Sequence, residues 1–171
     1  MTEIQNPDST AAQGPRSRMS DPMDLLPDLR EVSAALFKVV GNGSVPQSTM
    51  TLVHLRAGQI VGNTYLTMMH TGILRRAGET EERITAVSSW QDALCFTAAE
   101  RAALALVEAV LTPAPAGAER VPDEVFARAA EHFDDKALAT LVVAIGQVNF
   151  FIPLALIGKP LPGMPASKQW T

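Results

Sequence analysis

The sequence predicts an all-α fold, and three observations support that prediction. Apolar residues recur at helical spacing, i, i+3, i+4 and i+7, through most of residues 28–157. Residues that favour helix N-termini precede these segments, and glycine or proline follows them. No segment shows the strict alternation of apolar and polar residues that is typical of a half-buried strand.

The first two predicted helices lie before residue 61. One spans residues 28–40, DLREVSAALFKVV, and ends where the turn sequence GNGS begins. The other covers about residues 50–60, where Leu52, Leu55 and Gln59 share one face.

The third predicted helix runs from about Thr64 to Ala77 and carries the most complete apolar stripe. Asn63 is expected to cap its first turn, and Gly78 stands where a helix commonly ends. The stripe consists of Leu66, Met69, His70, Ile73, Leu74 and Ala77. A histidine within such a stripe is either a packed core residue or a group that faces a cavity.

Two helices are predicted next from their capping residues. Thr80 precedes a first turn with Glu81 and Glu82, where the helix dipole favours acidic side chains. Residues 97–100, TAAE, form a capping box and open a helix that stops before Pro113.

Two further helices complete the predicted domain. Apolar spacing from Val125 to Phe133 predicts the first of them. Either Asp134 or Asp135 is expected to cap the second. Its apolar stripe is Leu138, Leu141, Val142, Ile145 and Val148.

These elements predict one helical domain over residues 21–157, with a segment at each side of it. Residues 1–20 are polar and aperiodic, so we expect a disordered arm. Residues 158–171 form a proline-rich tail that is expected to lie on a surface or against a neighbouring subunit, with Trp170 as its anchor. Helix stripes rich in alanine and valine favour close packing and an oligomeric bundle.

The composition argues against several classes of protein. The formal net charge is −4 and lysine and arginine form no run, so neither nucleic acid nor an anionic membrane is an expected partner. The N-terminus has no apolar signal region, and the longest apolar segment is interrupted by Gly146, Gln147, Asn149 and Pro153. We therefore expect no membrane span and a cytoplasmic protein.

No metal ion or other cofactor is expected. Cys95 is the single cysteine, so it cannot make an internal disulfide or a cysteine-rich zinc site. His54 and His132 are far from His70 in the sequence, and His70 has no second ligand one turn away.

Four segments resemble the core of the alkylhydroperoxidase D-like (AhpD-like) and carboxymuconolactone decarboxylase superfamily. In order, they are LVHLRAGQI at 52–60, MMHTGILRRAGETEER at 68–83, SSWQDALCFTAAERAAL at 88–104 and AIGQVNFF at 144–151. The resemblance covers residues 28 to about 157. It implies an AhpD-like helical bundle that assembles as a homo-oligomer, a trimer or a hexamer.

The peroxidase branch of that superfamily carries the pattern E-L-x-x-x-R-x-S-Q-x-N-G-C-x-x-C-x-x-x-H, and this chain matches it only in part. The matching residues are Arg56, Gln59, Gly62 and His70. The two cysteines fall on Asn63 and Leu66, the glutamate on Thr51 and the serine on Gly58. Dithiol reduction of a hydroperoxide needs a thiolate and a second thiol that resolves the sulfenic acid. The sequence therefore predicts that this mechanism is lost.

The resemblance places His70 where the superfamily lines its reactive pocket, and His70 is the candidate catalytic residue. Asn63, Tyr65, Leu66, Thr67 and Arg56 are the candidate residues for binding a substrate. Arg56, like Glu100 and Arg101, is alternatively an ion-pair partner between helices. Cys95 is alternatively a buried, inert thiol or a one-cysteine peroxidatic group.

Three functions remain open at this point. The first is a thiol-independent enzyme or binding protein with a small-molecule pocket around His70, as in the decarboxylase branch, which does not depend on the cysteine pair. The second is a catalytically silent oligomeric scaffold, which predicts a pocket filled by Leu66, Met69 and phenylalanines. The third is the alkylhydroperoxidase activity of the superfamily.

Overall fold

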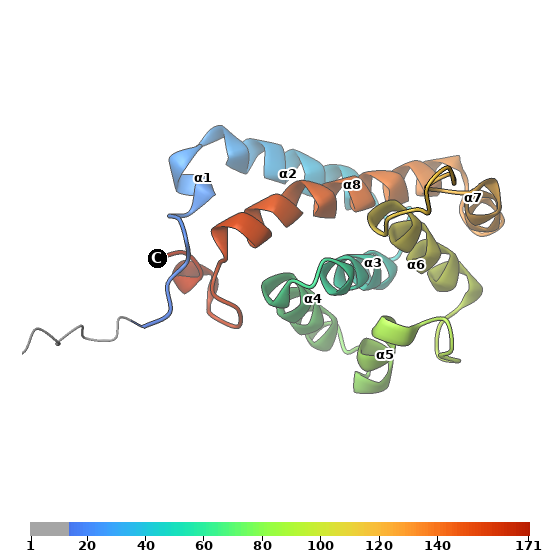
Figure 1. Ribbon diagram of the computed structural model, residues 1–171, viewed down its shortest axis with the longest axis horizontal. Coiled ribbons are helices and arrows are strands. Elements are labelled where there is room, and N and C mark those ends of the chain that lie inside the picture. Colours follow the sequence, from blue (N-terminus) through green and yellow to red (C-terminus); the bar gives the residue numbers. More distant parts are fainter. Residues whose placement is uncertain (1–13) are drawn as a thin grey trace, which may run out of the picture.

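The computed structural model describes residues 14–171, and every regular element in that range is a helix, which confirms the all-α prediction. The helices are α1 (Pro22–Leu25), α2 (Asp28–Val40), α3 (Gln47–Ile60), α4 (Thr64–Arg76), α5 (Glu81–Ala86), η1 (Val87–Ser89), α6 (Ala98–Leu111), α7 (Asp123–Ala130), α8 (Asp135–Gly158) and η2 (Ala166–Lys168). Figure 1 shows α2 lying along α8 on one side, with α3, α4 and α6 on the other side of α8.

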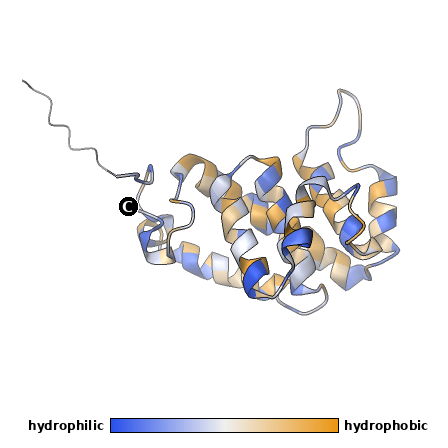
Figure 2. Ribbon diagram, turned by 90° about the horizontal axis from the view of Figure 1, so that it is seen from below, coloured by the Kyte–Doolittle hydropathy of each residue, from blue (hydrophilic) through white to orange (hydrophobic). Residues whose placement is uncertain are grey.

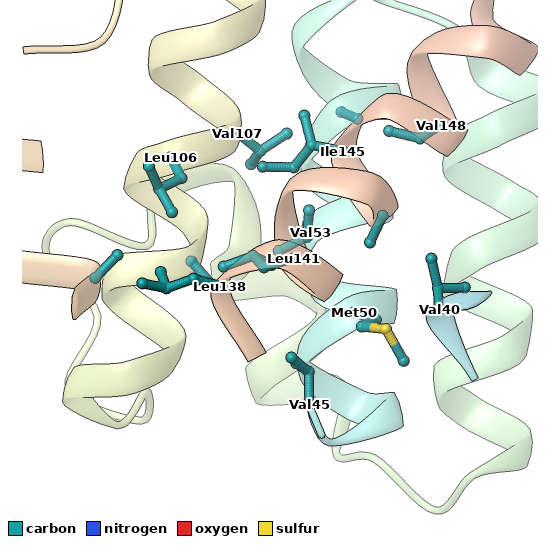
Figure 3. Close-up of a cluster of buried hydrophobic side chains, with 14 of the residues drawn as sticks. Val40, Val45, Met50, Val53, Leu106, Val107, Leu138, Leu141, Ile145 and Val148 are labelled. Atoms are coloured by element: carbon teal, nitrogen blue, oxygen red, sulfur yellow. The ribbon is translucent and has the colours of Figure 1, made fainter. Parts of the chain in front are cut away.

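Helix α3 is the centre of the fold, because it contacts α4, α6, α8 and η1. Buried side chains are found on all its faces, as expected of a helix that is surrounded by others. Two buried clusters meet at α3. Val53 belongs to the larger cluster, which α6 and α8 complete, whereas Leu52 and Leu55 belong to the smaller one. Figure 3 shows the larger cluster, with Val53, Val107 and Ile145 converging from α3, α6 and α8.

Helix α8 extends beyond the apolar stripe that predicts it, which ends at Val148. Gly146, Gln147, Asn149 and Pro153 interrupt the apolar run of this segment, and the helix runs through all four of them to Gly158. A proline inside a helix removes one backbone donor, and the remaining hydrogen bonds hold the helix across it. By length and composition α8 could cross a bilayer; here it packs against α2, α3 and α7 as a core helix of the bundle.

The caps agree with the sequence in most places. Thr80 and Asp134 accept hydrogen bonds from backbone N–H groups in the first turns of α5 and α8, so Asp134 is the cap of the two candidates. Thr97 and Glu100 form the expected capping box. The start of α3 differs, because it begins directly after Pro46, three residues before the predicted bound. Figure 2 shows that most helices carry both hydrophobic and hydrophilic residues, as expected of amphipathic helices.

Candidate functional site

His70 lies on the buried face of α4, between Leu66 and Leu74 at intervals of one turn. Its side chain is 7% exposed. The adjacent methionines face opposite ways, since Met68 is 47% exposed whereas Met69 packs against the larger core cluster. The stripe read from the sequence therefore gives the correct face of α4.

A second histidine, His54 of α3, lies beside His70, with 5.2 Å between the ring centroids. Its distance from His70 in the sequence argued against a shared metal site, but the contact between α3 and α4 brings the two rings together. His54 Nε2 is 3.0 Å from the carbonyl oxygen of Ala144 in α8. Because a carbonyl only accepts, Nε2 carries the hydrogen, and Nδ1 of the neutral ring is an acceptor.

Both imidazoles are neutral at physiological pH. Burial, together with the neighbouring His54, lowers the pKa of His70 to about 3. Burial also lowers the pKa of His54, against the opposing effect of its hydrogen bond to the Ala144 carbonyl. The pair therefore offers hydrogen-bonding groups without bringing positive charge into the interior.

The two histidines line a cavity of about 250 Å³. Most of its wall is apolar or aromatic, and the polar groups are few and come from separate helices. The residues that line it are Asp21, Pro22, Met23, Ser33, Phe37, His54, Tyr65, Leu66, Met69, His70, Gln147, Val148, Phe151, Leu154, Ala155, Pro160 and Trp170. A concave, mainly apolar space with a few convergent polar groups is typical of a small-molecule site.

Gln147 of α8 is a further polar wall residue that sequence reasoning did not single out. It is only 2% exposed, and neither its amide oxygen nor its amide nitrogen pairs with another protein group in the described chain. His70 Nδ1 is unpaired in the same way. A signal was present in the sequence, because Gln147 lies three residues after Ala144 and one before Val148, within the buried part of the last helix.

Both ends of the described chain close over this cavity. Trp170 and Pro160 contribute to its wall from the C-terminal tail, and Asp21 contributes from the N-terminal side. The two ends are joined by hydrogen bonds, from Arg18 N to the Gly158 oxygen at 2.7 Å and between Ser17 and Thr171. Of the expected arm, residues 1–13 lie outside the described residues, and residues 14–20 lead into this contact.

Tyr65 fastens the C-terminal tail to α4. Its hydroxyl donates to Gln169 Oε1 at 2.8 Å, next to Trp170. Burial raises the pKa of Tyr65, and the nearby Asp21 carboxylate raises it further, so the phenol remains protonated. Tyr65 therefore acts both as part of the cavity wall and as the anchor of its cover.

Gly158 provides a specific way to disturb this cover. A Cβ at this position would lie 2.6 Å from Cζ3 of Trp170, whereas a Cβ at Gly146 of the same helix would meet nothing within 4 Å. We expect Gly158→Ala to displace Trp170 and shift its fluorescence emission to longer wavelength. Gly146→Ala should leave the emission unchanged and stabilise the fold by up to about 1 kcal/mol. Identical emission spectra for the two variants would contradict the contact.

The other residues predicted for substrate binding fall into two groups. Tyr65 and Leu66 line the cavity with His70, whereas Asn63, Thr67 and Arg56 lie outside its wall. Arg56 pairs with Glu108, and its guanidinium also donates to the Ser88 carbonyl at 3.1 Å. Glu108 additionally accepts hydrogen bonds from Trp90 and Gln91. Arg56 thus joins α3 to α6, in agreement with its alternative interpretation.

Asn63 caps α4, and its Oδ1 accepts from Leu66 N at 2.9 Å. We expect Asn63→Ala to lower the free energy of unfolding by about 1 kcal/mol, because a first-turn N–H loses its partner. Chemical denaturation of the two proteins measures this difference. An Asn63→Ala protein as stable as the wild type would show that the Asn63 cap does not stabilise α4.

Other residues singled out in the sequence have structural roles. Glu100 pairs with Arg83 rather than with Arg101, whose guanidinium instead donates to the backbone oxygens of Trp90, Gln91 and Ala93. Cys95 packs against the smaller core cluster, and its carbonyl accepts a hydrogen bond from Arg83. Within residues 14–171, no group of three histidine, cysteine or acidic side chains is placed to hold a metal ion.

Thr51, Gly58 and Leu66, which align with catalytic-pattern residues of the peroxidase branch, have structural roles in this chain. Thr51 donates its hydroxyl to the Gln47 carbonyl within α3. At Gly58, helices α3 and α4 approach so closely that an added Cβ would be 3.0 Å from the Cβ of Leu66. Leu66 is 2% exposed and belongs to the larger core cluster.

Comparison with known proteins agrees with this architecture. The sequence model of the carboxymuconolactone decarboxylase family matches residues 27–109, from α2 to α6. The uncharacterized protein YdfG of Bacillus subtilis (strain 168) is 32% identical over 127 residues, which cover 74% of this chain and 84% of YdfG. The chain belongs to the carboxymuconolactone decarboxylase family.

Solved structures show the same AhpD-like fold. One is a protein of unknown function from Agrobacterium tumefaciens that has been suggested to be the antioxidant defence protein AhpD. It has a TM-score of 0.77 and 28% identity over 88% of this chain and 100% of that chain. The debrominase Bmp8, a cysteine-to-alanine variant in complex with 2,3,4-tribromopyrrole, has a TM-score of 0.71 and 22% identity over 85% and 75% of the two chains.

Proposed function

We propose that this family member binds a compact, neutral and largely apolar small molecule in the cavity around His70, without thiol chemistry. The observation that carries the proposal is the buried pair of His54 and His70 on the wall of an otherwise apolar cavity. A filled scaffold pocket, with Leu66, Met69 and phenylalanines closing the space, would leave no such cavity. The few convergent polar groups favour recognition of a specific ligand.

The electrostatics of His70 favour binding over proton transfer. A group with a pKa of about 3 is protonated in only about one molecule in ten thousand at pH 7. Such an imidazole is a poor proton donor and a weak base in the unliganded protein, since efficient acid–base groups have a pKa near the working pH. His70 therefore serves best as a neutral hydrogen-bonding group.

The chemistry at the former thiol positions also supports binding. Asn63 is occupied as a helix cap and Leu66 as a core side chain, and neither can form a sulfenic acid. Cys95 is not part of the cavity wall. The debrominase neighbour, which holds 2,3,4-tribromopyrrole, illustrates that a compact ring compound is accommodated by a protein of this fold.

Calorimetric titration tests this function. We expect indane, a neutral bicyclic hydrocarbon, to bind the protein with a stoichiometry of one per chain. Phenylacetate, an anion of similar size, should bind far more weakly, because transferring a carboxylate into an apolar cavity without a cation is costly. Tighter binding of phenylacetate than of indane would contradict the proposal.

We also propose that the chain assembles as a homo-oligomer, a trimer or a hexamer, through the outer sides of α2 and α8. Large apolar side chains are exposed there: Val32, Phe37, Val39, Val142, Phe150 and Ile157. Exposed large apolar side chains on two neighbouring helices are consistent with a protein–protein contact. Light scattering at micromolar concentration is expected to give a multiple of the chain mass, and a monomer mass would refute the assembly.

A further inference from the structure

The amide of Gln147 is the least satisfied polar group in the cavity wall. Its oxygen and nitrogen are both buried and unpaired within the described chain, and only 2% of the residue is exposed. Leaving a buried donor or acceptor without a partner costs free energy, because the group has lost its hydrogen bonds to water. A ligand that pairs with both atoms recovers this free energy on binding.

A carboxamide presents its two polar atoms on one edge, with the oxygen as acceptor and the nitrogen as donor. The complementary ligand edge carries a donor directly beside an acceptor. A lactam has this arrangement, because its ring holds the N–H and the C=O on the same side of the amide bond. The edge of a simple ketone or an ester lacks the donor, and a carboxylate lacks it as well.

The rest of the wall restricts the charge and shape of the ligand. Neither lysine nor arginine belongs to the described residues that form the wall, and the one ionisable acid there is Asp21. An anion would therefore lose its hydration without gaining a counter-charge. The rings of Phe37 and Phe151, with centroids 6.3 Å apart, and the indole of Trp170 offer flat apolar surfaces.

We propose that the cavity recognises a neutral cyclic amide, a lactam fused to an apolar ring, through two hydrogen bonds with the side chain of Gln147. This inference rests on the proposed function and specifies its ligand class. The ring system lies among the aromatic side chains, and the lactam edge faces α8.

Titration calorimetry with four related probes tests the inference. Oxindole is a bicyclic lactam, N-methyloxindole lacks the donor, indane lacks both polar atoms and phenylacetate is the anion. We expect oxindole to bind about tenfold more tightly than N-methyloxindole, which corresponds to one additional good hydrogen bond. Phenylacetate should be the weakest of the four.

Variants assign the preference to one side chain. Gln147→Leu is expected to bind oxindole and N-methyloxindole equally, while Gln59→Leu keeps the tenfold preference. Gln59 is the matched control, because its amide oxygen is also buried and unpaired but lies outside the cavity wall. Gln147→Met serves the same purpose as Gln147→Leu if the branched side chain disturbs packing.

The possible outcomes distinguish failure of the lactam assignment from failure of small-molecule binding in the cavity. Binding of indane with no preference for oxindole over N-methyloxindole overturns the lactam assignment and leaves the proposed function standing. A preference that persists in both Gln147→Leu and Gln147→Met also overturns it. Absence of binding for all four probes overturns the proposed function, and the lactam assignment with it.

Discussion

Replacing Met69 by tryptophan is expected to weaken indane binding by at least about a hundredfold, which corresponds to about 2.7 kcal/mol. Met69 packs against the core and forms part of the cavity wall beside His70. A rigid indole at this position occupies the space that the ligand needs, whereas the flexible thioether leaves it open. Calorimetry measures the loss, and circular dichroism verifies that the helices are retained.

Met68→Trp is the matched control for that experiment. Met68 is the preceding residue on the same helix, it is 47% exposed and it lies outside the cavity wall. The same chemical change there should alter indane affinity less than about threefold. Equal losses in the two variants would show that the indane site lies elsewhere.

Glu100→Ala is expected to lower the free energy of unfolding by about 2 kcal/mol, because charge-assisted hydrogen bonds are lost. Glu100 is 8% exposed, and its carboxylate contacts Arg83 at 2.6 Å. It also accepts from the backbone N–H of Thr97 at 2.8 Å, which completes the capping box of α6. Removal of the carboxylate takes one partner from the partly buried Arg83 guanidinium, which keeps Glu79 and the Cys95 carbonyl, and leaves the backbone N–H of Thr97 without its side-chain acceptor. Chemical denaturation measures the difference.

The contribution of Glu100 also depends on pH. Burial raises the pKa of Glu100, but the hydrogen bonds from Arg83 and Thr97 outweigh it and hold the pKa below its ordinary value of 4.5. A carboxyl whose pKa is lower in the folded state stabilises the fold above the unfolded pKa. This stability disappears as the pH falls through 4.5 toward the folded value. Glu100→Gln should therefore lose less stability than the wild type on acidification.

The exposed residue Glu82 is the control for both measurements. Glu82→Ala should change the free energy of unfolding by less than about 0.5 kcal/mol and leave its pH dependence unaltered. A Glu100→Ala protein that is no less stable than Glu82→Ala would show that neither the ion pair with Arg83 nor the capping box contributes.

Most of the helices could be predicted from the sequence, because local spacing and caps determine them. The stripe through Leu66, His70 and Leu74 identifies the buried face of α4 without any tertiary information. Helix α8 was the exception. Its apolar stripe predicts a helix only as far as Val148, and packing against α2, α3 and α7 supports the helix beyond it, through Pro153.

The candidate site could be predicted only where it follows from a single helix. Tyr65, Leu66 and His70 lie within the first two turns of α4, so their spacing along one helix places them near one another. His54 and Gln147 come from α3 and α8, and only the crossing of those helices brings them to His70. The resemblance to the superfamily pointed to Arg56, but its partner Glu108 lies on α6, and no local pattern reveals that pair.

A crystal structure of the protein soaked with a bromine-substituted indane tests the central claim most directly, because the anomalous signal of bromine locates the ligand. We expect the bromine peak inside the cavity, within van der Waals contact of the wall beside His70 and Met69. Bromine peaks confined to the outer surface at saturating ligand, with the cavity closed by its own side chains, would contradict a small-molecule site around His70.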